Sequence, residues 1–157
     1  MVYQELCLKN WFLWGIYLEL KKLVGNMFIN INYLINKIKN AILLKKKYIY
    51  FLYIKYIIKI LFILKNEGYI YNFFIINNKI HYKRQIKIYI KYLNKKPAIN
   101  KIKLISKSSR RIYVKYKNIP IIKNNYGISV LSTSKGILVN KKAIFYKIGG
   151  EYLFYIY

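Results

Sequence analysis

The sequence has few of the residues that most catalytic and metal sites require. It contains no aspartate, and its 4 acidic residues, all glutamates, stand against 30 lysines and arginines. Cysteine and histidine each occur once, as Cys7 and His81. A lone cysteine excludes an internal disulfide, and one cysteine with one distant histidine does not make a zinc site. Because a catalytic constellation needs several such groups together, we expect no enzyme, no cofactor and no small-molecule substrate.

Long uncharged hydrophobic runs are also missing. The apolar stretch Trp11–Leu18 is too short to span a bilayer, and it lacks the basic start and the cleavage site of a secretory signal. The run from Tyr48 to Leu64 is interrupted by Lys55 and Lys59, so a core strand followed by a core helix is expected there. We therefore expect no stable membrane insertion. A basic protein that associates with a membrane is kept as an alternative to a nucleic-acid-binding protein.

The net charge of +26 predicts a polyanionic partner, which is RNA, DNA or an anionic membrane. Codon bias is a second cause of this composition, because Lys, Asn, Ile, Tyr and Phe all have A/T-rich codons. Such a bias replaces arginine by lysine, and the only arginines are Arg84, Arg110 and Arg111. It does not explain the near loss of acidic residues, so both causes are expected to act. We assign most of the 19 tyrosines to the core and to this bias, and not to stacking platforms.

Residues 1–26 differ from the rest, since they hold both tryptophans and two of the four glutamates. We interpret them as an N-terminal extension of uncertain status. An extension without a specific role, or even a start codon upstream of a true start at Met27, is the favoured explanation, and a targeting or docking element is the other.

The pattern after Met27 predicts an α+β fold with an α/β first half and a mainly β second half, and the length allows two small domains. Residues 27–93 are expected to form an α-β-α-β-β domain, with Gly68 ending the second helix and a hairpin turn at Asn77-Asn78. Residues 94–106 are expected to be a linker, and residues 107–157 a mainly β domain with a short helix. The expected helices are 28–44 and 55–67, the expected strands are 48–54, 69–76 and 80–93, and the short apolar runs 102–105, 112–114 and 119–122 are either strands or extended linkers.

The stretch Ser129–Gly136 carries the clearest chemistry. Three hydroxyl residues, Ser132, Thr133 and Ser134, are followed by Lys135 and Gly136. Hydroxyl groups both donate and accept hydrogen bonds, so they suit sugars and base edges, and one lysine can neutralise a phosphate. Gly136 permits a backbone geometry that other residues resist. Taken alone, such a loop is more often a solvated turn than a binding site.

Several separated motifs resemble the family of the eighth small-subunit ribosomal protein, of bacterial or organellar type. Gly127-Ile128, Ser132 to Gly136, and Gly149-Gly150-Glu151 stand at the spacing of the family's C-terminal signature. The resemblance extends upstream, and in order, to Lys37–Asn40, Lys65–Ile70, Ser106-Lys107 and Arg111–Tyr113, so that it covers roughly residues 28–157.

Some positions depart from the family pattern. Ser108-Ser109 replaces a Pro-Gly pair, which predicts a looser turn, and Ile144 replaces a usual arginine. Asn140 replaces an aspartate at the start of the last helix, where it is expected to serve as the N-cap. Asn125 replaces a glycine and is expected to tolerate a positive φ.

The resemblance implies a primary RNA-binding protein of the small ribosomal subunit, with two small α/β domains of which the C-terminal one binds RNA. It implies contact with the central domain of the small-subunit rRNA, with the Ser-Thr-Ser-Lys-Gly loop at an irregular helix, and neighbouring small-subunit proteins as further partners. A/T-rich composition with a bacterial-type signature indicates the ribosome of an organelle, a reduced plastid of the apicoplast kind, with a mitochondrion or an A/T-rich bacterium as alternatives. The RNA-binding residues expected are Ser132, Thr133, Ser134, Lys135, Gly136, Arg110, Arg111, Tyr113, Glu151, Lys37, Lys39 and Lys55.

Two of these assignments carry alternatives. Glu151 is the only acid in its half, and it either orients Lys or Ser side chains of the loop, which we favour, or accepts a hydrogen bond from a base amine. Arg110 and Arg111 are either a solvated edge or, with Tyr113, a patch that tracks the RNA backbone and stacks on bases.

Overall fold

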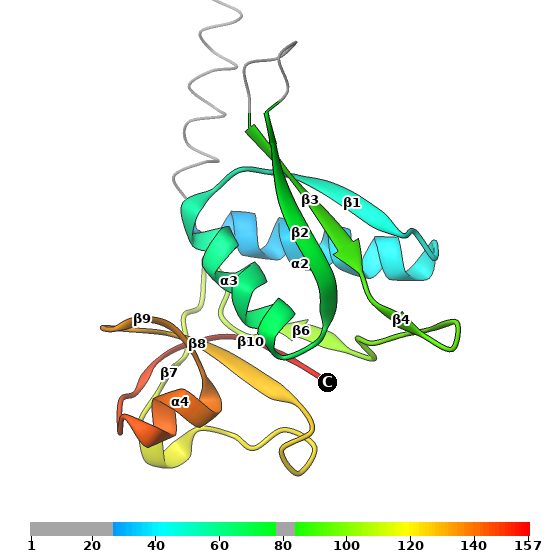
Figure 1. Ribbon diagram of the computed structural model, residues 1–157. Helices are drawn as coiled ribbons and strands as arrows, with labels where there is room; N and C mark the ends of the chain where they lie inside the picture. Colours follow the sequence, from blue (N-terminus) through cyan, green and yellow to red (C-terminus); the bar gives the residue numbers. More distant parts are fainter. Residues whose placement is uncertain (1–26, 78–83) are drawn as a thin grey trace, which may run out of the picture.

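The computed structural model describes residues 27–77 and 84–157 (Figure 1). The interpretation of residues 1–26 and half of the expected turn at Asn77-Asn78 lie outside the described residues. The elements in chain order are α2 (Met27–Leu43), β1 (Tyr48–Leu52), α3 (Lys55–Asn66), β2 (Ile70–Asn77), β3 (Arg84–Ile90), β4 (Tyr92–Leu93), β5 (Lys96–Pro97), β6 (Ile102–Leu104), β7 (Tyr113–Val114), the 3-10 turn η1 (Tyr116–Asn118), β8 (Ile128–Thr133), β9 (Gly136–Val139), α4 (Asn140–Phe145) and β10 (Gly150–Ile156).

The two long helices follow their apolar spacing. In α2, one stripe is no more than 1% exposed because its residues recur at helical intervals: Ile31, Leu34, Ile35 and Ile38. Helix α3 buries Ile57, Ile60, Leu61 and Leu64 in the same way. It ends at Asn66 with Glu67 as its C-cap, and the predicted helix-ending glycine, Gly68, follows with a φ of +78°, which suits the residue after a C-cap. Within residues 27–77 and 84–157 no helix is long and apolar enough to cross a membrane.

The first sheet is antiparallel, in the order β1-β3-β2. Its inner face carries Ile49, Ile86 and Ile88, each buried. Its outer face places the Lys87 ammonium 4.2 Å from the ring centre of Tyr48 and 5.2 Å from that of Tyr89. Because the faces of aromatic rings attract cations, exposed tyrosines can interact favourably with the lysines of this surface.

The assignment of tyrosines to the core therefore holds only in part for the described residues, where Tyr53, Tyr56 and Tyr92 pack partly buried against the core; the assignment to codon bias stays a prediction. Tyr69 and Tyr152 are the buried tyrosines there, whereas several others are exposed. A phenol is amphipathic, so a surface strand can carry it with its hydroxyl in water.

The second sheet has the order β6-β10-β8-β9, with β7 also pairing with β10. Strand β6 comes from the segment predicted to be a linker, and residues 94–95 form the turn of a small β4–β5 hairpin, where Asn94 and Lys95 both have positive φ. The apolar runs 102–105 and 112–114 contain strands, but 119–122 does not, and Ile119 instead packs with Leu131 and Ala143. The α+β class is confirmed, whereas the domain boundaries stay a prediction.

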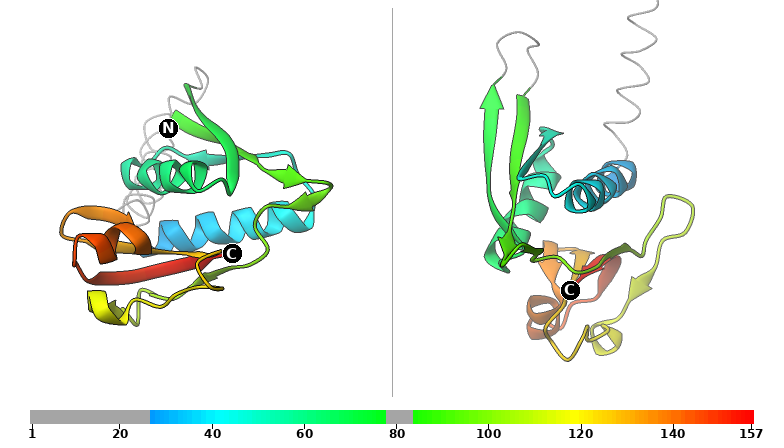
Figure 2. Two further views of the ribbon diagram at one scale, coloured as in Figure 1. Left: turned by 60° about the horizontal axis from the view of Figure 1, so that its bottom comes forward. Right: turned by 90° about the vertical axis from the view of Figure 1, so that its right-hand side faces the viewer.

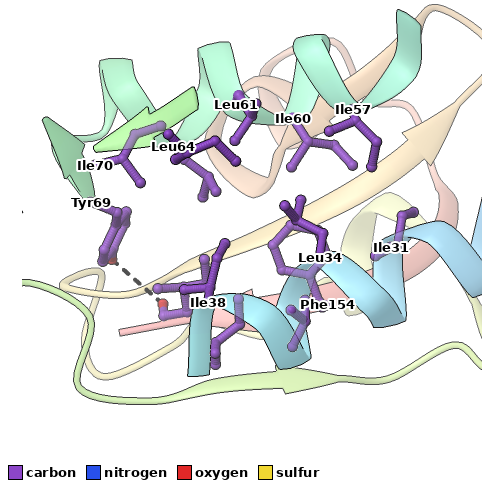
Figure 3. Packing of buried hydrophobic residues seen from close by; sticks show 14 of the residues in the cluster. Ile31, Leu34, Ile38, Ile57, Ile60, Leu61, Leu64, Tyr69, Ile70 and Phe154 are labelled. Atoms are coloured by element: carbon purple, nitrogen blue, oxygen red, sulfur yellow. Dashed lines mark hydrogen bonds between the residues drawn. The ribbon is translucent and has the colours of Figure 1, made fainter. Parts of the chain in front are cut away.

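Helices α2 and α3 lie between the two sheets (Figures 1 and 2). Helix α2 contacts β1 and β6, and α3 contacts β2 and β9, so each helix touches both sheets. Phe154 of β10, 1% exposed, joins the same buried cluster as Leu34 and Ile60 (Figure 3). The Tyr69 hydroxyl donates to the backbone oxygens of Tyr126 at 3.2 Å and Ile156 at 3.5 Å. One continuous core therefore connects the two halves.

Three local expectations can be compared with the backbone. Asn125 has the expected positive φ, at 70°. The turn at Ser108-Ser109 is not loose, because Lys107 and Arg110 exchange backbone N–H···O bonds of 2.9 and 3.2 Å across it. The expected N-cap is wrong: Val139 occupies that position, and Asn140 is the first helical residue. Val139 is still paired with Val130, so strand β9 runs directly into α4. The extended position just before the helix is therefore taken by Val139, and Asn140 already lies in the helix.

The core makes a direct prediction for stability. Ile60→Ala should lower the free energy of unfolding by about 2–5 kcal/mol, because Ile60 is 0% exposed between the sheets. Urea denaturation measures this change. The neighbouring Lys59→Ala, an exposed site on the same helix, should stay within about 0.5 kcal/mol of the parent. Equal losses in the two variants would contradict the described core.

Candidate nucleic-acid interface

The hydroxyl-rich loop is the tip of the β8–β9 hairpin. Thr133 pairs with Gly136, so Ser134 and Lys135 form a two-residue turn and are both exposed. The Thr133 hydroxyl donates to the Gly136 carbonyl at 2.8 Å and closes the turn. Gly136 has φ +106°, a region that favours glycine, as its place in the motif predicted. The turn therefore presents one hydroxyl and one ammonium to solvent on a fixed backbone.

Strand pairing extends this loop into a row across the sheet. Glu151 of β10 lies opposite Ser132 of β8 and opposite Tyr113 of β7. Directly opposed residues of antiparallel strands point to the same face. Residues about 20 and 40 positions apart in the chain thus converge, and three of the predicted site residues form one row across the sheet, with Glu151 buried in its middle.

Glycine permits the close approach of the strands at this row. A Cβ at Gly150 would meet the Ser132 carbonyl oxygen, and the next nearest atom, Cγ2 of Thr133, would lie 2.9 Å away. At Gly149 a Cβ would approach the backbone of Val114 and Lys115. The prediction that this glycine pair allows close packing beside the loop agrees with these contacts.

Glu151 is the buried charge of the interface. It is 6% exposed, and its Oε1 atom has no hydrogen-bond partner. Burial raises the pKa of this carboxyl, and the nearby Arg111 guanidinium partly offsets that rise. The Arg111 Nε lies 4.0 Å from the Oε1 atom. Arg111 is therefore the charged neighbour of Glu151. Its expected role of orienting Lys or Ser side chains of the loop stays a prediction.

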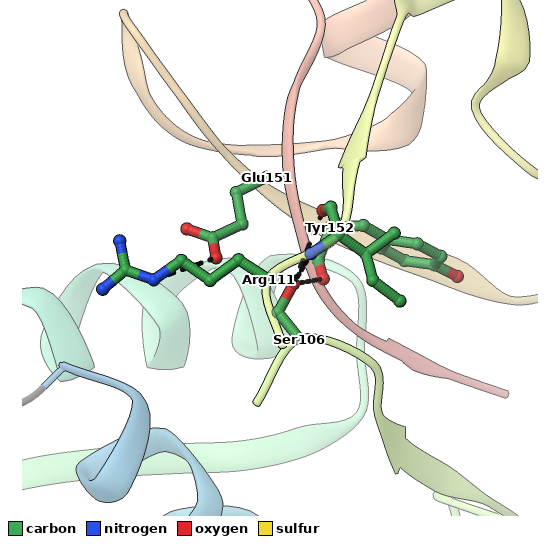
Figure 4. A network of polar contacts seen from close by, with 5 residues as sticks. Ser106, Arg111, Glu151 and Tyr152 are labelled. Carbon is green, nitrogen blue, oxygen red and sulfur yellow. Dashed lines mark hydrogen bonds and ion pairs between the residues drawn. The ribbon is translucent and has the colours of Figure 1, made fainter. Parts of the chain in front are cut away.

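The backbone between Arg111 and Tyr113 is held against Tyr152 of β10 by a buried serine, Ser106, which Figure 4 shows with Arg111 and Glu151. The Ser106 hydroxyl, 0% exposed, donates to the Tyr152 carbonyl at 2.6 Å and accepts from the Ile112 N–H at 3.1 Å. Tyr152 N–H donates to the Ile112 carbonyl at 2.8 Å. These bonds fix the segment on both sides of Arg111 against β10, so its guanidinium projects over Glu151. Arg110 is exposed at the adjacent turn.

Lys135 has an aromatic neighbour that sequence reasoning missed. Its ammonium lies 5.0 Å from the ring centre of Tyr146, the C-cap residue of α4. Helix α4 packs under β8 and β9 through Ala143 and Leu131, which brings its C-terminal end to the hairpin tip. The ten residues between Lys135 and Tyr146 gave no signal for this contact, because it depends on how the helix packs.

The lysines predicted in the first half do not join this row as a group. Lys37 contacts the Tyr33 hydroxyl at 3.4 Å and lies over the rings of Tyr33 and Phe51, beside β1. Lys39 lines a hollow beside β6 on another side of α2. Lys55 is exposed at the first turn of α3, the helix that contacts β9. Lys37 and Lys39 are two residues apart and so lie on different helix faces.

The arrangement suits recognition of a polyanion with sugar hydroxyls. Exposed Lys135, Arg110 and Arg111 can contact phosphates, Ser132 and Ser134 can bond 2′-hydroxyls or base edges, and Tyr113, 67% exposed, can stack on a base. The described residues hold no group of histidine, cysteine and acidic side chains that could bind a metal ion.

Comparison with known proteins gives one consistent result. The family described as Ribosomal protein S8 matches residues 30–157. The chain is 44% identical over 120 residues to the small ribosomal subunit protein uS8 of Borrelia turicatae, which covers 75% of this chain and 89% of that protein. It is 39% identical over 129 residues to the small ribosomal subunit protein uS8c of Tupiella akineta, which covers 81% of this chain and 96% of that protein. Since family match and relatives agree over the same part of the sequence, the chain belongs to the ribosomal protein S8 family.

Proposed function

We propose that this chain is a structural, non-enzymatic constituent of the small ribosomal subunit that binds the central domain of small-subunit rRNA and supports assembly. Family membership supports the role in the small subunit. The observation that carries RNA binding is the row formed by Tyr113, Glu151 and Ser132 beside the Ser134-Lys135 turn. Neighbouring small-subunit proteins are further partners.

The binding step combines two kinds of contact. Lys135, Arg110 and Arg111 neutralise phosphates and supply most of the affinity, which makes binding steeply dependent on salt. The hydroxyls of Ser132 and Ser134 read the shallow minor groove and its 2′-hydroxyls, where A-form RNA is accessible. Glu151 acts by orienting Arg111, since that guanidinium is the charged group beside it. Lys37, Lys39 and Lys55 add affinity that does not depend on sequence.

Loop substitutions test the assignment of Ser132–Gly136. Ser132→Ala with Ser134→Ala should weaken binding to a central-domain rRNA fragment on the order of tenfold, because two hydrogen-bonding groups are lost. Lys135→Ala should reduce the slope of log K against log salt by about 1. Filter binding over a salt series measures both.

The matched control is Lys96→Ala, which removes one exposed cation at the β4–β5 hairpin. It should leave the salt slope unchanged. If Lys96→Ala and Lys135→Ala altered the slope equally, or if the serine pair had no effect, the loop would not be the binding element.

Glu151 makes a prediction about pH. Because its pKa is raised in the folded chain, the carboxyl favours folding when protonated. The free energy of unfolding should thus fall as pH rises from about the unfolded pKa through the higher folded value. Glu151→Gln should remove this fall and unfold at a higher urea concentration than the parent at pH 7, while binding rRNA more weakly. If the free energy of unfolding of Glu151→Gln depended on pH as that of the parent does, burial of the Glu151 carboxyl would not be its cause.

We further propose that the ribosome concerned is that of a plastid, of the reduced apicoplast kind. The A/T-rich codon composition and the likeness to the uS8c protein of Tupiella akineta support this choice. In cells that make the protein, it should sediment with ribosomes from a purified plastid fraction, detected by mass spectrometry. Recovery only with mitochondrial or bacterial cytoplasmic ribosomes would overturn the compartment and leave the RNA-binding proposal intact.

A further inference from the structure

An aromatic group at the end of α4 adjoins the loop, and the proposed function does not use it. Phe145 is 80% exposed and Tyr146 is 48% exposed. Their rings meet edge-to-face, with centroids 5.3 Å apart and an interplanar angle of 75°. Single exposed hydrophobic residues need no explanation, but this pair also contacts the Lys135 ammonium through Tyr146. The pair is therefore part of the surface at the hairpin tip.

The packing of α4 explains why these rings are outside the core. Ala143 is 0% exposed and fixes the buried face of this short helix against Leu131. Backbone N–H groups of Tyr146 and Lys147 donate to the carbonyls of Lys142 and Ile144, at 3.0 Å each, and end the helix. The chain then turns at Lys147, which has φ +53°, toward β10. Phe145 is left on the outward side with its ring open to solvent.

The geometry brings a ring and a cation to the same place. Tyr146 lies between the two, since its ring contacts the Lys135 ammonium at 5.0 Å and the Phe145 ring at 5.3 Å. A nucleotide likewise presents a charged phosphate together with a flat base. An exposed phenylalanine offers a stacking face that accepts any base, and the adjacent lysine offers a partner for the phosphate.

We propose that Phe145 stacks on one unpaired base of the rRNA, with Tyr146 positioning Lys135 for the phosphate of the same strand. This inference rests on the proposed function and adds a contact on the α4 side of the hairpin, opposite the row of Tyr113, Glu151 and Ser132. Leu131 and Leu138, which neighbour Ser132 and Ile137 in the register, face α4, so the two groups lie on opposite faces of the sheet. The RNA then contacts both faces around the hairpin tip.

Variants of Phe145 in the full chain test the stacking contact. Phe145→Ala should weaken binding to the central-domain rRNA fragment between about fivefold and about 150-fold, the range for loss of one stacked base. Phe145→Leu should lose most of the same affinity, because it keeps apolar surface without a ring, whereas Phe145→Tyr should bind within about twofold of the parent. None of the three should change the salt slope, because no charge is removed, in contrast to Lys135→Ala.

Two further measurements separate stacking from a structural effect. Tyr126→Ala removes an aromatic side chain that is 88% exposed elsewhere and should bind like the parent. Phe145→Trp should show tryptophan emission that is quenched when RNA is added, beyond any change in the parent, whose own tryptophans are Trp11 and Trp14. For the positioning role, Tyr146→Ala should weaken binding in the parent background and have little effect in Lys135→Ala.

The outcomes divide cleanly. Parent-like binding by Phe145→Ala, with the loop variants still impaired, would overturn the stacking contact and leave the proposed function standing. An equal loss in Phe145→Leu and Phe145→Tyr, or an unquenched Phe145→Trp, would also overturn it. If the parent chain itself failed to bind the rRNA fragment, both proposals would fall. Additive losses from Tyr146→Ala and Lys135→Ala would remove the positioning role of Tyr146.

Discussion

The pairing of β10 on both edges is the constraint on which the rest of the structure depends. One edge binds β8, and the other binds β6 and β7, so segments from residues 102 to 133 are brought to a single strand at the C-terminal end of the sequence. The same strand sends Leu153, Phe154 and Ile156 into the core shared with α2 and α3. Burial of those side chains supplies the non-directional stabilisation, and the ladder on both edges fixes the register. A shift of β10 by one residue would turn Glu151 away from Ser132 and expose the core face.

The distribution of charge follows from this architecture. Nearly all cations of the described chain lie on the surface, whereas Glu151 is buried where three strands meet. A buried carboxyl with a raised pKa is a cost to folding, and Arg111 compensates for it only in part. Perturbed pKa values are common at functional sites, which is consistent with the place of Glu151 beside the hydroxyl-rich loop.

Regular periodicity made much of the fold predictable. The stripes of α2 and α3, the alternation of β3 and the glycine after α3 are local signals, because each residue's environment depends on neighbours within a few positions. The predictions that failed also concerned single residues and turns, but they failed because of contacts with distant parts of the chain. Asn140 missed the N-cap because β9 stays paired up to Val139, and the turn at Ser108-Ser109 is tight because the segment after it is bound to β10. Several tyrosines that were assigned to the core lie on the surface, because a phenol suits both a core and a basic surface.

The sequence by itself determined the α+β class, the polyanionic partner class, the family and the residues of the hydroxyl loop, because composition, period and motif spacing are properties of the chain. Only the tertiary structure decided which of those residues meet. It placed Tyr113, Glu151 and Ser132 in one row and put Lys37 and Lys39 in different surroundings. It also placed Arg111 beside Glu151, and it brought Tyr146, with Phe145 against it, beside Lys135. Contacts between residues far apart in the chain depend on strand register and helix packing, which are set by the whole core and by no single segment.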